Sequence, residues 1–271
     1  MSSSINTNVN SINAQRSLAA TSNSLSTAME RLSSGLRVNS AKDDAAGLAI
    51  AERMDAQTRG MNVAIRNAND AISLAATAEG AWSAISTNLQ RMRELAVQGS
   101  NGTNTTTDVA SLDLEYALLV KENTRISTAT KFNNTAVIGS TAAGFTFQIG
   151  ANSVALDDQI TVTSTVWSAT ASSLGTSTAD AFAEISKIDV DIDAATTARA
   201  TWGANQNRFE TVIANLRVGA ENSAAAHGRI VDADYAQETA KLTRAQVLQQ
   251  AGTAMVAQAN QGPNGVLALL R

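Results

Sequence analysis

The chain has 271 residues, of which 44% are hydrophobic but only 4% aromatic, and it carries a net charge of -4, no cysteine, one histidine and one proline. This composition excludes a disulfide framework, thiolate chemistry and a zinc site of the HExxH type, and the scattered Lys and Arg residues form no basic patch for nucleic acid. Apolar content made mostly of Ala, Leu, Ile and Val, with almost no helix breaker, favours long and closely packed helices.

Three long apolar repeats predict the central helices. Residues 50–96 carry apolar side chains at alternating spacings of three and four, which is typical of a coiled-coil-like helix. A second helix is predicted from Asp108 to Ala129, with Thr105 and Asp108 starting it as a capping box, and a third over residues 185–216. Because each helix has one apolar stripe, the three must pack on one another.

The pattern between the second and third helices predicts a β-hairpin. Phe145, Phe147 and Ile149 alternate with polar residues, and a second alternating run follows at residues 160–166. We therefore expect a small β-hairpin region at about 132–166, with residues 150–158 turning the chain. The Ser/Thr/Ala-rich residues 167–180 have neither periodicity nor bulk for a core, so we expect them to form a surface connection.

Both ends of the chain have apolar residues at helical spacing but almost no charge. The first charged side chain is Arg16, and none lies between Arg244 and Arg271. Charged residues normally keep an exposed helix solvated, so we expect these helices to be marginal alone and to become ordered against other subunits. The residues expected to make these contacts are Ile5, Val9, Ile12, Leu18, Leu25, Met29, Leu32, Leu242, Leu248, Met255, Leu267 and Leu270. The alternative is an intramolecular coiled coil of the two ends in a stable monomer.

Sequence features for catalysis, cofactors and targeting are lacking. His227 is the only histidine, and Asp232 and Asp234 are better explained as helix-face groups than as an acid/base pair. We therefore predict no enzyme activity, no cofactor and no metal. The N-terminal residues lack the basic and apolar regions of a Sec signal, and no window is apolar enough to insert in a membrane. These features alone predict a cytoplasmic protein.

Several long motifs resemble the terminal regions of bacterial flagellins. They include LSSGLRVNSAKDDAAGLAIAERM at residues 32–54, LQRMRELAVQ at 89–98 and RIVDADYAQETAKLTRAQVLQQAGTAMVAQANQ at 229–261. The resemblance covers roughly residues 1–140 and 180–271, with the motifs in the family's order. The chain is thus identified as a member of the flagellin family in a short form.

The resemblance implies a mainly α fold of long antiparallel coiled-coil-like helices. Residues 1–40 and 235–271 would form an inner terminal-helix domain, residues 41–234 a rod-like helical domain, and no outer variable domain would be present. The family implies a secreted structural subunit that polymerises into the flagellar filament for motility after export by the flagellar type III apparatus. Its implied partners are further copies of the chain, the flagellar cap and hook-filament junction proteins, and an export chaperone. The nearest alternative is a hook-filament junction protein.

The RMRELAVQ run also resembles the part of flagellins that the flagellin-sensing Toll-like receptor of animals recognises. On this resemblance Arg91, Leu95 and Glu115 are receptor-recognition residues. The alternative is that they serve only subunit contacts, with Leu95 a packing residue.

A loop follows the first terminal helix. Gly35 and Gly47 flank the NSAKDD segment, and the resemblance implies a hinge here between the inner and rod domains. The alternative is simple helix punctuation. Within the loop, Ser40 with Asp43 is expected to cap the next helix.

Overall fold

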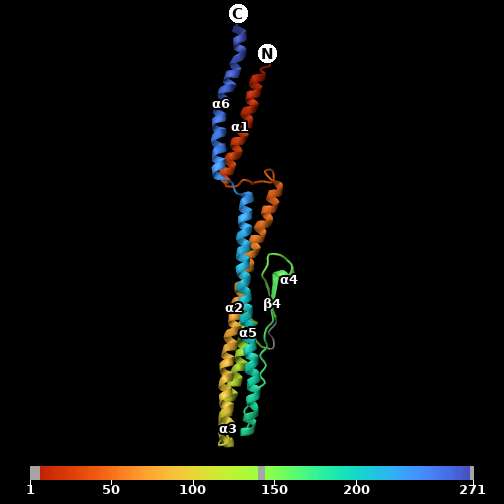
Figure 1. Ribbon diagram of the computed structural model, residues 1–271, viewed down its shortest axis with the longest axis vertical. Helices are drawn as coiled ribbons and strands as arrows, with labels where there is room; N and C mark the ends of the chain where they lie inside the picture. Colours follow the sequence, from red (N-terminus) through yellow and green to blue (C-terminus); the bar gives the residue numbers. More distant parts are fainter. Residues whose placement is uncertain (1–6, 140–143, 269–271) are drawn as a thin grey trace. The chain divides into compact units, whose positions relative to one another are not determined.

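Helices dominate the computed structural model, which describes residues 7–139 and 144–268 (Figure 1). Within these ranges the helices are α1 (Val9–Ser34), α2 (Ala45–Gly99), α3 (Thr106–Ala129), α4 (Ala155–Asp158), α5 (Thr178–Val231) and α6 (Tyr235–Ala268). Two antiparallel strand pairs accompany them: β1 (Lys131–Phe132) with β2 (Thr135–Ala136), and β3 (Phe145–Gln148) with β4 (Gln159–Val162). The predicted fold class, mainly helical with a small β region, is confirmed.

The chain divides into two compact units. The terminal unit comprises Met1–Ala56 and Asn222–Arg271, and the central unit comprises Gln57–Glu221. These boundaries fall inside α2 and α5 and differ from the predicted ones at residues 41 and 234. The end of α5 belongs with the terminal helices because main-chain bonds hold it there: Arg37 N–H donates to the Val231 carbonyl at 2.6 Å and Ala233 N–H to the Gly35 carbonyl at 2.9 Å.

The core of the central unit lies between α2, α3 and α5. Its largest fully buried side chains include Trp82 of α2, Tyr116 of α3, and Trp202 and Phe209 of α5. Most of the predicted stripe of α2 is buried, while Ile50 at its start is 38% exposed; the buried members are Ala68, Ala75, Ala78, Trp82, Ile85, Leu89, Met92 and Ala96. Long helices with one buried stripe are therefore confirmed, and each begins before and ends at or after its predicted limits.

Helix starts test two of the predicted caps. At α3 the capping box is confirmed, since the Thr105 side chain accepts from Asp108 N–H while the Asp108 side chain accepts from Thr105 N–H. At α2 the prediction is wrong. Ser40 and Asp43 bond to each other at 3.0 Å within the preceding turn, and it is Asp44 that accepts the Gly47 N–H at 2.8 Å. Asp44 caps α2 because it stands directly before the first helical residue.

The predicted hairpin is present as β3 and β4. Phe145 pairs with Val162 and Phe147 with Ile160, and the intervening turn contains α4. The hairpin packs closely on α2. A Cβ on Gly60 would lie 2.7 Å from the Cβ of Ala151, so the absence of a side chain at Gly60 permits this approach.

The segment 167–177, which we call the strap, contradicts the prediction of a surface connection. Ala171 and Leu174 are completely buried, and Trp167 is 7% exposed. The ring of Trp167 lies edge-on to that of Trp82, with centroids 5.8 Å apart. The buried indole nitrogens of both rings find no hydrogen-bond acceptor in the described part of the chain, so apolar packing holds this contact.

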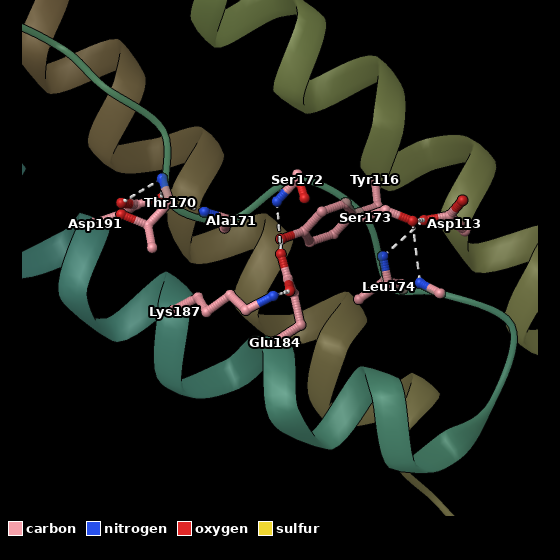
Figure 2. A network of polar contacts seen from close by, with 11 residues as sticks. Asp113, Tyr116, Thr170, Ala171, Ser172, Ser173, Leu174, Glu184, Lys187 and Asp191 are labelled. Atoms are coloured by element: carbon pink, nitrogen blue, oxygen red, sulfur yellow. Dashed lines mark hydrogen bonds and ion pairs between the residues drawn. The ribbon is translucent and has the colours of Figure 1, made fainter.

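Carboxylates of the neighbouring helices hold the strap in place, with most of its apolar residues buried and most of its Ser and Thr residues exposed (Figure 2). They accept the strap's backbone N–H groups at 2.6–3.0 Å: Asp191 binds Thr170 and Ala171, Glu184 binds Ser172, and Asp113 binds Leu174. The main-chain N–H of Ala171, which would otherwise be buried without a partner, is thereby satisfied. The strap thus joins α3 to α5.

Glu184 is the centre of this polar network. It is 2% exposed, accepts the Tyr116 hydroxyl at 3.1 Å and pairs with Lys187 Nζ at 2.8 Å. Burial, followed by the charge of Glu184, raises the pKa of the Tyr116 phenol well above its ordinary value. Tyr116 therefore stays a hydrogen-bond donor throughout the neutral range.

Candidate assembly surface

Helices α1 and α6 pack side by side in the terminal unit (Figure 1). They run in opposite directions, since Ser11 near the start of α1 bonds Asn260 near the end of α6, and Arg31 bonds Glu238 at the other end. Their less exposed residues recur at spacings of three and four, as in a coiled coil. We call these positions the seam: Ser11, Ala14, Leu18, Thr21, Leu25, Ala28 and Leu32 on α1, with Glu238, Leu242, Ala245, Gln249, Gly252, Val256 and Ala259 on α6.

Local sequence places the two helices. The Asn8 side chain caps α1 by accepting the Ser11 N–H, and its Nδ2 donates to the Ala259 carbonyl of α6 at 2.7 Å. Gly35 ends α1 with a φ of 73°, in the left-handed region that favours glycine. In the middle of the seam a Cβ on Gly252 would lie 3.1 Å from Leu18 Cδ1, so glycine lets the helices approach closely.

A buried ionic cluster closes one end of the seam. Glu238 is 4% exposed and binds Arg31 at 3.2 Å and Lys241 at 3.1 Å. Burial acts to raise the pKa of the Glu238 carboxyl, but the bonds to the Lys241 and Arg31 cations outweigh it, so the pKa lies below its ordinary value. The carboxylate is therefore ionised at neutral pH and links α1 to α6.

The residues predicted to make subunit contacts separate into two groups. Leu18, Leu25, Leu32 and Leu242 lie half-buried in the seam, in contact with the chain's own partner helix. The two terminal helices of one chain therefore pair with each other, as in the alternative of an intramolecular coiled coil. Periodicity singled out these leucines but could not specify the partner helix, and their contact with other subunits stays a prediction.

The second group points away from the seam. Its members are 50–61% exposed, and we refer to them together, on whichever side of the pair they lie, as the outward face: Val9, Ile12 and Met29 on α1, and Leu248 and Met255 on α6. Val247, 59% exposed, also points away from the seam, although it is not among the predicted contact residues. Of the remaining predicted residues, Ile5 and Leu270 lie outside the described residues, and Leu267 is placed only by its helical backbone.

A groove of about 550 Å³ lies along one side of the pair. Small residues such as Ala20 and Ala28 line it together with Leu248, and Lys241 and Arg244 line its basic part. Small side chains allow another backbone to come close, so the groove is suited to receive side chains of a second helix.

The predicted hinge residues all belong to the terminal unit. Gly35 directly precedes Leu36, which forms an isolated β-bridge with Asp232, and Ser40 and Asp43 form the exposed turn before α2. Gly47 lies in the first turn of α2 rather than beside it. Bonds from Ser40 lower the pKa of the Asp43 carboxyl, which strengthens the turn at neutral pH.

The predicted receptor residues are not equally accessible. Arg91 bonds Glu115 of α3 at 2.8 Å and Glu94 at 2.9 Å, and all three side chains are about half exposed or more. These bonds raise the pKa of Arg91. Leu95 is 1% exposed and belongs to the core, so of the predicted set only Arg91 and Glu115 form an accessible surface.

In the described ranges, no three His, Asp or Glu side chains are grouped so as to hold a metal ion. Nor is any helix of those ranges both long and apolar enough to cross a membrane. The described residues thus define a mainly helical protein whose two terminal helices pair with each other.

Comparison with known proteins gives the family. The bacterial flagellin N-terminal helical region matches residues 5–142, and the bacterial flagellin C-terminal helical region matches residues 185–270. The chain therefore belongs to the bacterial flagellins, which are structural proteins of the flagellar filament and not enzymes.

Individual relatives agree with this assignment. The flagellin of Halalkalibacterium halodurans is 46% identical over 270 residues, covering 98% of this chain and 99% of that flagellin. Flagellin A of Vibrio anguillarum is 33% identical over 379 aligned positions that include the whole of both chains. The crystal structure of Bacillus cereus flagellin is 36% identical and superposes with a TM-score of 0.51, over 60% of this chain and 94% of that one.

Proposed function

We propose that this flagellin polymerises through the outward face of α1 and α6, while the seam holds the two helices of each subunit together. The observation that carries the proposal is the set of large apolar side chains left exposed on helices that have almost no charge. Burial contributes roughly 1.5–3 kcal/mol for each such side chain. The five predicted residues are only 50–61% exposed, so burying what remains of them gives about half of this value for each, or roughly 4–8 kcal/mol per subunit, which falls within the estimated cost of association, roughly 4–15 kcal/mol.

The domain arrangement follows from the same proposal. Residues 1–40 and 235–271 would form the filament's inner terminal-helix domain and residues 41–234 its rod-like helical domain, with no outer variable domain. The alignment with the Vibrio anguillarum flagellin supports the lack of an outer variable domain. It extends over 379 positions, whereas this chain has 271 residues, so the relative contains segments that this chain lacks. In the described part of the connection between α3 and α5, the structure has the two hairpins and the strap.

The route outside the cell is export by the flagellar type III apparatus, with an export chaperone before secretion and the cap and hook-filament junction proteins as neighbours afterwards. The absence of cysteine supports threading through a channel, since no disulfide has to be opened. In cells without the export apparatus the protein should accumulate inside. Its appearance in the medium of such cells would contradict this route.

Recognition by the host's flagellin-sensing Toll-like receptor is proposed for the Arg91–Glu115 pair. The pair is exposed and joins α2 to α3, so it presents a fixed charged surface. The test is a receptor reporter assay on Arg91→Ala, with Arg125→Ala as control because Arg125 forms an equally exposed pair with Glu122. Loss of signal only at Arg91 is expected, and equal signals from both variants would refute the assignment.

Seeded polymerisation tests the main proposal. Purified full-length protein is mixed with short filament seeds and followed by electron microscopy, next to a version without residues 1–40 and 235–271. Ile12→Ser and Met255→Ser remove apolar surface without touching the seam, and Leu156→Ser is the matched control because Leu156 is 94% exposed in the hairpin turn. We expect slower growth for the two terminal variants and unchanged growth for the control. Equal growth of all three would reject the outward face as the assembly surface.

A hook-filament junction protein remains the alternative function. Such a protein is needed in few copies and should not elongate its own seeds into long filaments. Seeded growth of the full-length chain alone would exclude it, and failure to grow together with low cellular abundance would support it.

A further inference from the structure

The loop between α2 and α3 contains an Asn101–Gly102 pair whose reactive atoms are free. Both residues are exposed. Neither the Asn101 side chain nor the Gly102 N–H bonds to any residue in the described ranges. A Cβ placed on Gly102 would have no atom within 4 Å, so the space around its nitrogen is open.

We propose that Asn101 is a site of spontaneous deamidation. The Gly102 nitrogen, after losing its proton to solvent, attacks Asn101 Cγ, so that a new C–N bond closes a succinimide ring and the side-chain amide leaves as ammonia. Water then opens the ring. Cleavage at Cγ leaves aspartate, whereas cleavage at the main-chain carbonyl carbon leaves isoaspartate. The reaction needs no enzyme and no reactant other than water and base.

Asn104, three residues later in the same loop, lacks the required freedom. Its Nδ2 donates to the Gln98 carbonyl at 2.6 Å, and the next N–H, of Thr105, is held by Asp108 at 2.8 Å. Attack there would first break two hydrogen bonds, one of them to a charged carboxylate. At roughly 1.5 kcal/mol or more, that cost slows the reaction about tenfold or more. The second Asn–Gly pair of the chain, at residues 264 and 265, lies within the helical backbone of α6.

The product would loosen the end of α2. A new carboxylate appears just after Gly99, the last residue of α2, where the helix dipole disfavours negative charge. Isoaspartate also displaces the Asn101 carbonyl that accepts the Asn104 N–H at 3.0 Å. Aged protein should therefore carry a loop between α2 and α3 that opens more readily than that of fresh protein.

Peptide mass spectrometry of the full-length protein tests the proposal. Samples are incubated at mildly acidic and mildly alkaline pH, digested, and scored for conversion of amide to acid at Asn101 and Asn104, with enzymatic methylation to count isoaspartate. The matched variant is Gly102→Ala. Gly102 has no left-handed φ, so alanine fits the backbone and only shields the attacking nitrogen.

We expect Asn101 to convert about tenfold or more faster than Asn104, faster at alkaline pH, with isoaspartate among the products. The Gly102→Ala variant should convert several-fold more slowly while its circular dichroism stays unchanged. Equal rates at Asn101 and Asn104, or no slowing in the Gly102→Ala variant, would overturn the proposal.

Discussion

Replacement of Asp191 by alanine should release the strap from the central unit. Asp191 is 2% exposed and accepts the Thr170 and Ala171 N–H groups at 3.0 Å. Hydrogen bonds to a charged group contribute about 1.5–3 kcal/mol, and a buried N–H left without a partner costs about 1–3 kcal/mol. Because Ala171 is completely buried and cannot turn to water without moving the strap, we expect a loss of about 3 kcal/mol in the free energy of unfolding of the central unit.

Urea unfolding followed by tryptophan fluorescence measures this loss directly. All three tryptophans lie in the central unit, so the signal does not report on the terminal helices. Amide hydrogen exchange at Thr170 and Ala171 should accelerate in parallel. The control is Asp189→Ala. Asp189 lies on α5, as Asp191 does, but it is half exposed and pairs with Arg93 of α2, so its loss should cost less than about 1 kcal/mol. If the free energy of unfolding fell no more for Asp191→Ala than for Asp189→Ala, the carboxylates could not be what holds the strap in place.

Three further predictions concern other parts of the fold. Thr105→Ala removes the cap of α3 and should cost about 1 kcal/mol in thermal unfolding, with fraying of the loop before α3. Gly60→Ala should gain about 1 kcal/mol in helix propensity, but its new Cβ would press against Ala151. We therefore expect no gain in stability and faster amide hydrogen exchange in β3 and β4. The pKa of Glu238 is lowered in the folded state, so its stabilising contribution is complete above the ordinary carboxyl pKa and is lost as pH falls through the lowered value. Circular dichroism should accordingly show the terminal helices weakening in acid, and Glu238→Gln should remove that dependence.

Local patterns predicted the elements whose causes are local. The three-four spacing of residues 50–96 gave α2, and the Thr105–Asp108 pair gave the start of α3. The alternation of Phe145 and Phe147 gave β3. In each case the signal and the structure lie within a few residues of each other.

The strap could not be predicted because its burial depends on distant residues. Ala171 and Leu174 have too little apolar surface nearby to suggest a core. The groups that hold them, Asp191 and Asp113, lie 20 and 61 residues away along the chain. An aspartate on a helix usually indicates a solvated face, so its role as a backbone acceptor becomes visible only in three dimensions.

The terminal helices show a related difficulty. Periodicity found Leu18 and Leu25 as readily as Ile12 and Met255, but it does not specify which neighbour an apolar side chain meets. The structure resolves this by placing the first two in the seam and the last two outside it. Buried Leu95 is a similar case, since a motif identified it but gave no information on its exposure.

Oxidative footprinting of methionine tests the central claim most directly. Met29 and Met255 are 50% and 59% exposed on the outward face, whereas Met92 is 1% exposed in the core of the central unit. Monomer and assembled filament are treated with the same dose of peroxide, and each methionine is quantified by mass spectrometry. We predict that Met29 and Met255 react readily in the monomer and become protected in the filament, with Met92 protected in both. Equal oxidation of Met29 and Met255 before and after assembly would contradict polymerisation through this face.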